Sequence, residues 1–106
     1  MDLYFETTAP TSLKNDIISS IEDGELRTWS ILERDGIKYL KHTKQWGEKG
    51  VIKLEIDSNK KYLISKVLKF KNTNDEVKDF EGYYLGRFCE LIFVNFPSRF
   101  TKIEKK

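Results

Sequence analysis

Apolar residues recur at helical spacing near both ends of the chain. From Leu13 to Ile21 an apolar side chain returns every four residues, a pattern that predicts a helix of about three turns. Pro10 suits the first turn of this helix, and Gly24 suits its C-terminal stop. We expect one of three hydroxyl side chains to cap the helix, namely Thr8, Thr11 or Ser12.

A second and longer helix is predicted to run to about residue 96. Thr73 and Glu76 have the spacing of a capping box, and Pro97 cannot continue a helix, so these residues bound it. Projected at about 100° per residue, the positions from 77 onward give one broad apolar face, which must lie on a sheet. That face consists of Val77, Phe80, Tyr84, Leu85, Phe88, Leu91 and Ile92.

Between the two helices the hydrophobic pattern alternates with the period of a β-strand. Asp35 and Gly36 form a favoured type I′ turn, because both central residues of that turn take a positive φ. A two-residue turn fixes the register of a hairpin, so we expect Trp29 to lie opposite His42. Both sides of this hairpin carry apolar residues near the turn, and the pattern leaves open which side faces the core.

A second hairpin is expected over residues 51–70, with a turn at residues 57–60. In its first strand, alternation directs Ile52, Leu54 and Ile56 inward. A loop of three or five residues would place Ile56 opposite Tyr62, whereas a two-residue loop would place it opposite Lys61, and we expect the longer loop. The apolar residues that we expect to share one face of the second strand are Tyr62, Ile64, Leu68 and Phe70.

A short strand is also expected at residues 3–6, and a last strand near Phe100 and Ile103. Together these elements predict an α+β fold with two layers, in which two helices pack on one face of an antiparallel sheet of five to six strands. The order along the chain is β-α-β-β-β-β-α-β. We expect a single domain over residues 1–106, with residues 105–106 as a solvated tail.

The composition excludes several classes of protein. A chain of 106 residues with 39% hydrophobic residues, 6 Gly and 2 Pro is neither disordered nor collagen-like. One Cys and one His exclude a disulfide framework and an ordinary His/Cys zinc site. No apolar run approaches the roughly 20 residues of a membrane span, and the N-terminal segment is acidic. We therefore expect a cytoplasmic protein that makes no membrane contact.

The net charge of +2 hides an uneven distribution of charge along the chain. Residues 1–36 hold eight acids and three bases, whereas residues 37–71 hold ten lysines and three acids. Lysines beside aromatic residues on strands can bind single-stranded nucleic acid, although a solvated sheet face explains the same pattern. The candidate nucleic-acid contacts are Lys38, Lys41, His42, Lys44, Trp46 and Lys53.

The back of the second predicted helix is apolar for a surface that should face water. It carries Gly82 and Gly86 on one stripe, and each glycine inside a helix costs about 1 kcal/mol relative to alanine. A neighbour that packs into this groove would compensate. That neighbour is either the first helix or N-terminal strand of the same chain, or a second copy of the chain. The candidate partner-binding residues are Gly82, Gly86, Phe93, Val94 and Trp46.

No nucleotide-binding, nucleophile-elbow or zinc-protease motif occurs in the sequence. His42 lacks a second catalytic group to work with, and we expect it to pack on Trp29 as a structural residue. Cys89 lies among apolar neighbours in the second helix, where a cysteine acts as a small hydrophobic side chain. These observations favour a protein without catalytic activity.

Three functions from different classes remain. The leading hypothesis is a non-catalytic interaction protein, without metal or cofactor, that forms a homodimer or grips another protein through the second helix and the sheet edge. The alternative is weak nucleic-acid binding through the hairpins of residues 37–71. The third is an anion or ligand site between the sheet and the second helix, with Arg87, Tyr84 and Phe88 as contacts. Arg87 could instead stack on Tyr83, pair with Glu90 or reach a carboxylate on the sheet.

Overall fold

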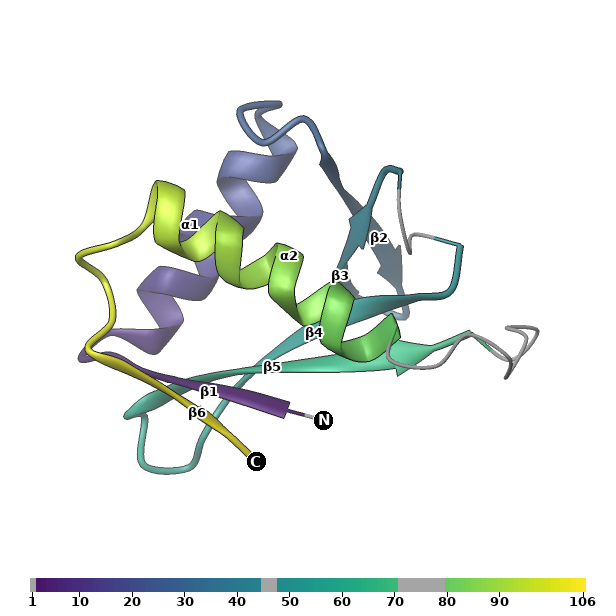
Figure 1. Cartoon of the computed structure of the whole chain (residues 1–106). Helices are drawn as coiled ribbons and strands as arrows, with labels where there is room; N and C mark the ends of the chain where they lie inside the picture. The colour runs from purple at the N-terminus through teal and green to yellow at the C-terminus, as the bar shows by residue number, and fades with distance from the viewer. Residues whose placement is uncertain (1, 45–47, 71–79) are drawn as a thin grey trace.

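The computed structural model describes residues 2–44, 48–70 and 80–106. Within these ranges the chain forms two helices and six strands (Figure 1). In chain order they are β1 (Asp2–Glu6), α1 (Pro10–Glu22), β2 (Trp29–Arg34), β3 (Ile37–His42), β4 (Gly50–Ile56), β5 (Tyr62–Lys69), α2 (Phe80–Asn95) and β6 (Lys102–Lys105). This order confirms the α+β class and the sequence of elements that the hydrophobic pattern predicted.

The six strands form one antiparallel sheet in the order β2-β3-β4-β5-β1-β6. The N-terminal strand β1 lies between β5 and β6, so the two ends of the described chain meet in the sheet. Both helices cover the same face of the sheet (Figure 1). The predicted two-layer architecture is therefore confirmed.

The hydrophobic core fills the space between the helices and the sheet. Burying one large apolar side chain contributes roughly 1.5–3 kcal/mol, so this layer supplies most of the stabilisation of the fold. The rings of Phe5 on β1 and Phe88 on α2 meet edge to face, with their centroids 5.6 Å apart. The fully buried side chains include Phe5, Leu13, Ile17, Leu40, Ile52, Leu63, Tyr84, Phe88 and Ile92.

The apolar face predicted for the second helix is confirmed from Phe80 to Ile92, since the residues of that stripe are buried against the sheet. The helix ends at Asn95, shortly before Pro97, as predicted. The predicted capping box and the first apolar position fall within residues 73–77, which lie outside the described residues.

α1 begins without the side-chain cap that the sequence predicted. Ala9 is the N-cap residue, and no side chain bonds to the first amide groups of the helix from that position. Thr8 precedes the cap position, while Thr11 and Ser12 lie inside the first turn, so none of the three can cap it. Instead the hydroxyl of Thr7 accepts a hydrogen bond from the N–H of Ala9 at 3.3 Å.

Gly24 ends α1 as predicted, in the left-handed conformation with a φ of 80°. Its N–H donates to the carbonyl of Ile21 at 3.1 Å, and the N–H of Glu25 donates to the carbonyl of Ser20 at 3.0 Å. These two bonds form a Schellman motif, which pairs carbonyl groups that the helix end would otherwise leave open.

The first hairpin has the predicted turn and register. Asp35 and Gly36 take φ angles of 55° and 79°, as a type I′ turn requires, and Trp29 lies opposite His42. Trp29, His42 and Leu40 are buried, so this side of the hairpin faces the helices. The burial of these residues settles the question that the sequence pattern leaves open.

The second hairpin differs from the predicted register by one residue. Ile56 lies opposite Leu63 rather than Tyr62, so the core face of β5 carries Leu63, Ser65 and Val67. A shift of one residue exchanges the two faces of a strand. The opposite face therefore receives residues that were predicted to lie inward, Tyr62, Ile64 and Leu68.

Asp57 sets the register of the second hairpin. Its carboxylate accepts hydrogen bonds from the backbone N–H groups of Asn59, Lys61 and Tyr62, at 3.2, 2.7 and 2.7 Å. Lys60 takes a positive φ of 56°, and its N–H donates to the carbonyl of Asp57 at 3.0 Å. Residues 58–61 consequently form a four-residue loop, instead of the three- or five-residue loop that was expected.

The backbone of the last two residues continues the sheet, although their side chains are exposed as expected. Lys105 belongs to β6 and lies opposite Leu3. The backbone of Lys106 exchanges two hydrogen bonds with the backbone of Asp2, at 2.9 and 3.2 Å. The ammonium group of Lys106 also lies over the ring of Tyr4, 5.6 Å from its centroid.

Candidate functional site

The glycine stripe on α2 is open to solvent. A Cβ atom added at Gly82 or Gly86 would meet no described atom within 4 Å, apart from the helix's own backbone. α1 packs on β2, β4 and β5, so it does not fill the groove, and neither does β1. The prediction that a segment of the same chain occupies this groove is therefore wrong for the described residues.

Exposed apolar side chains gather on the same helix. Among the described residues, five large hydrophobic side chains are exposed, and three of these belong to α2. They are Tyr83, Phe93 and Val94, with 60%, 54% and 72% of their surface exposed. The ring of Phe93 is held edge to face against Phe100, with centroids 5.5 Å apart, so its orientation is fixed.

The exposed stripe of α2 combines small and bulky residues in an ordered way. Gly82, Gly86, Cys89 and Phe93 follow one another at helical spacings of four, three and four residues, so they lie along one line of the helix surface. Cys89 is partly buried, and burial raises the pKa of its thiol above the ordinary value. The thiol therefore stays protonated at neutral pH, which is the state of a structural cysteine rather than a nucleophile.

Tyr84, on the buried side of α2, holds the sheet together where two strands separate. β3 and β4 are paired at Leu40 and Ile52. At the end of β3, the Tyr84 hydroxyl accepts a hydrogen bond from the N–H of His42 and donates one to the carbonyl of Gly50, both at 2.9 Å. Burial raises the pKa of this hydroxyl to about 12. Tyr84 is thus a fully buried bridge between strands, and it does not line the cleft as a ligand contact would.

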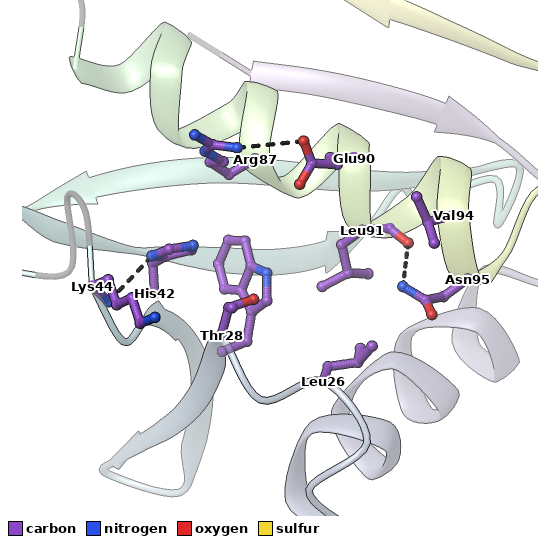
Figure 2. A pocket seen from close by; sticks show the side chains of 10 residues that line it. Leu26, Thr28, His42, Lys44, Arg87, Glu90, Leu91, Val94 and Asn95 are labelled. Carbon is purple, nitrogen blue, oxygen red and sulfur yellow. Dashed lines mark hydrogen bonds and ion pairs between the residues drawn. The ribbon is translucent and has the colours of Figure 1, made fainter.

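A cleft of about 340 Å³ opens where α2 passes the ends of β2 and β3 (Figure 2). Its walls come from three parts of the chain: the start of β2 with the residues before it, the end of β3, and one flank of α2. The lining residues are Leu26, Thr28, Trp29, His42, Lys44, Arg87, Glu90, Leu91, Val94 and Asn95.

His42 and Trp29 form the buried base of the cleft. Their rings meet edge to face with centroids 5.1 Å apart, which confirms the pairing predicted from the hairpin register. The Nδ1 atom of His42 accepts a hydrogen bond from the N–H of Lys44 at 3.3 Å. This bond uses Nδ1 as an acceptor and holds the ring against the backbone that follows β3.

The cleft is polarised along its length. Figure 2 shows Lys44 and His42 toward one end and Val94 toward the other, with Arg87 and Glu90 along the wall that α2 provides. The guanidinium of Arg87 lies 3.4 Å from the carboxylate of Glu90, which confirms one of the three contacts considered for this arginine. One end of the cleft is therefore cationic and the other end apolar.

The candidate nucleic-acid residues do not come together on one surface. Lys38 lies on the helix side of the sheet and pairs with Glu22 at 2.8 Å. By strand alternation Lys41 and Lys53 lie on the opposite face, where Lys53 is 3.4 Å from Glu55. Lys44 and His42 line the cleft instead. Trp46, a candidate for both partner and nucleic-acid contacts, lies outside the described residues.

Within residues 2–44, 48–70 and 80–106, no group of three or more His, Cys, Asp or Glu side chains could hold a metal ion. Neither helix of the described chain is long and apolar enough to cross a membrane. No family model, curated protein or solved structure matches this chain.

Proposed function

We propose that this protein is a non-catalytic interaction protein that forms a homodimer through the exposed face of α2. The observation that carries the proposal is the open glycine groove on a helix that also bears Tyr83, Phe93 and Val94 as exposed apolar side chains. A concentration of apolar surface of this kind is typical of a contact site. Two glycines inside an exposed helix are costly unless something packs against them.

The stripe Gly82, Gly86, Cys89 and Phe93 fits a second copy of itself. In a two-fold dimer the helices run antiparallel, and each patch meets the same patch on the partner. The two-fold axis would then pass between Gly86 and Cys89. This arrangement places each Phe93 over the opposite Gly82, and each Cys89 against the opposite Gly86. Every bulky residue of the stripe therefore meets a small one, which allows the two helices to approach closely.

The expected dimer is weak. α2 has 16 residues and a length of roughly 24 Å, so one pair of such helices buries less than the roughly 1,600 Å² of a standard interface. We expect dissociation in the micromolar range or above, and exchange between monomer and dimer at the concentrations used for structural work.

Sedimentation velocity over a concentration series, with the wild type and Gly86→Leu, tests the proposal. The mass of the wild type should rise from 12.5 kDa toward twice that value, whereas Gly86→Leu should remain at 12.5 kDa because its side chain fills the groove. The variant should fold, since a Cβ at position 86 meets open space and leucine favours a helix by about 0.5–1 kcal/mol over glycine.

Ser19→Leu is the matched control, because it adds the same side chain at an exposed position of α1. It should dimerise like the wild type. A wild type that stays monomeric at millimolar concentration contradicts the proposal. So does a Gly86→Leu variant that associates as tightly as the wild type.

A further inference from the structure

We propose that the cleft between α2 and the ends of β2 and β3 binds a small organic monoanion, a carboxylate joined to an aromatic or branched apolar body. The carboxylate would lie at the end formed by Lys44 and Arg87, and the apolar body would lie against Leu26, Leu91 and Val94. This site uses a different flank of α2 from the glycine stripe, although Val94 belongs both to the exposed face of α2 and to the wall of the cleft. It does not require the proposed dimer, because its lining residues all come from one chain.

The size of the cleft fits a small molecule. Ligand pockets commonly measure roughly 300–1,000 Å³, and this cleft of about 340 Å³ lies at the lower end of that range. Its base is formed by Trp29, His42 and Leu91, which are almost completely buried, while Lys44 and Val94 are exposed at the rim. A ligand would consequently meet an apolar base and a partly charged rim, as specific small-molecule sites do.

The charges of the lining fit a single negative charge. Among the lysine, arginine and glutamate side chains of the lining, Lys44 and Arg87 contribute two positive charges and Glu90 one negative charge, a sum of +1. The guanidinium of Arg87, which already pairs with Glu90, has five N–H donors in a planar fork, a geometry that suits carboxylates. A phosphate dianion or a nucleic-acid backbone would demand more positive charge than this cleft holds.

The opposite end of the cleft fits an apolar group. Leu26, Leu91 and Val94 come from two separate segments and face the same hollow. The side-chain amide of Asn95 donates to the carbonyl of Leu91 at 3.0 Å, which fixes this amide at the edge of the apolar end. An aromatic or branched aliphatic group would displace water from this end. Each methylene that it buries contributes about 0.8 kcal/mol to the free energy of binding.

The buried base of the cationic end is held in place before any ligand arrives. The imidazole of His42 is fixed by the ring of Trp29 and by the N–H of Lys44, and the backbone of His42 is fixed by the Tyr84 hydroxyl. A site whose groups are already ordered loses less conformational entropy on binding.

Phenylacetate and its neutral analogue phenylacetamide are the probes that test the proposal, because they share a ring and differ in charge. Trp46→Phe leaves Trp29 as the only tryptophan, so its fluorescence reports on the base of the cleft. Phenylacetate should change this fluorescence with saturation in the millimolar range, and phenylacetamide should bind at least roughly fivefold more weakly.

Arg87→Gln in the same background should weaken phenylacetate binding by roughly fivefold to tenfold. Lys61→Gln removes the same charge from an exposed position in the β4–β5 loop and should leave the affinity unchanged. Equal affinity for the two probes would overturn the proposal, as would an unchanged affinity in Arg87→Gln or the absence of saturable binding. Displacement of phenylacetate by a short single-stranded RNA at physiological salt would also overturn it, in favour of a nucleic-acid site.

Discussion

Removing the hydroxyl of Tyr84 should destabilise the protein although the ring remains. In Tyr84→Phe the N–H of His42 loses its acceptor and the carbonyl of Gly50 loses its donor, each from a bond of 2.9 Å. Both backbone groups belong to buried residues at the place where β3 and β4 separate, so water cannot readily replace the hydroxyl.

The size of the effect follows from the two lost bonds. A hydrogen bond within a protein contributes about 0.5–1.5 kcal/mol net, and a buried group left without a partner costs about 1–3 kcal/mol. We expect Tyr84→Phe to lower the free energy of unfolding by about 2–3 kcal/mol. For a domain of about 100 residues, a loss of this size lowers the melting temperature by roughly 10 °C or more.

Urea unfolding followed by circular dichroism measures this change, and hydrogen exchange of the His42 amide localises it. Tyr39→Phe is the matched control, because it removes the same hydroxyl from β3, where the Tyr39 hydroxyl makes no hydrogen bond to the described residues. The control should change stability by less than about 0.5 kcal/mol. A Tyr84→Phe protein as stable as the wild type, with unchanged exchange at His42, would refute the bridging role.

The same hydroxyl makes stability depend on alkaline pH. Burial raises the pKa of Tyr84 from 10.0 to about 12, so the folded state keeps this proton where the unfolded state releases it. The stabilisation is fully present below pH 10.0 and is lost as the pH rises toward 12, in total about 2–3 kcal/mol. The phenylalanine variant should lack this contribution in urea titrations across that interval. A pH profile identical to that of the wild type would contradict the assignment.

Three further changes test the close packing at Gly50, the open groove on α2 and the turn at Asp57. Gly50→Ala should destabilise the fold by about 3 kcal/mol in urea unfolding, because the added Cβ would overlap the carbonyl oxygen of Leu68 on β5. Gly82→Ala, at an open position, should stabilise it by about 1 kcal/mol, and the opposite ranking would refute the packing described here. Partial desolvation raises the pKa of the Asp57 carboxyl, whereas the hydrogen bonds from the backbone N–H groups of the turn lower it. The hydrogen bonds have the larger combined effect, so the pKa of this carboxyl lies below 3.8. Its contribution is thus present above pH 3.8 and is lost as the pH falls through the lowered value. In Asp57→Asn the Tyr62 amide should exchange faster at neutral pH, and equal rates would contradict the role of Asp57.

The two hairpins show what local patterns can and cannot predict. In the first, the Asp35–Gly36 turn determines both the backbone angles and the register, so the pairing of Trp29 with His42 follows from the sequence. In the second, both faces of β5 carry apolar residues, and the core face includes the small polar Ser65. Alternation alone therefore favours the wrong face. The deciding contact is the carboxylate of Asp57 with the turn amides, which selects a four-residue loop.

The buried face of the second helix could be predicted from the sequence, but whether a neighbour fills its glycine groove could not. The apolar stripe from Phe80 to Ile92 has a period that requires burial, and the sheet provides it. The glycines at 82 and 86 indicate only that something small is tolerated on the back of the helix. Whether a neighbour fills that groove depends on the path of α1, which packs on the sheet instead. The spacing of residues within α2 contains no information about that path.

The cleft depends on contacts between segments that are distant in the sequence, and one buried hydroxyl links them. No local pattern relates Lys44 to Arg87, because their proximity depends on how α2 crosses the end of β3. Tyr84 fixes that crossing, because it belongs to α2 and its ring is fully buried against the sheet. Its hydroxyl holds the backbone N–H of His42, two residues before Lys44. The flank of α2 that carries Arg87 and the end of β3 that precedes Lys44 are thus held together by the same residue. In the proposed site, a side chain that does not line the cleft therefore positions the backbone on which both charges lie.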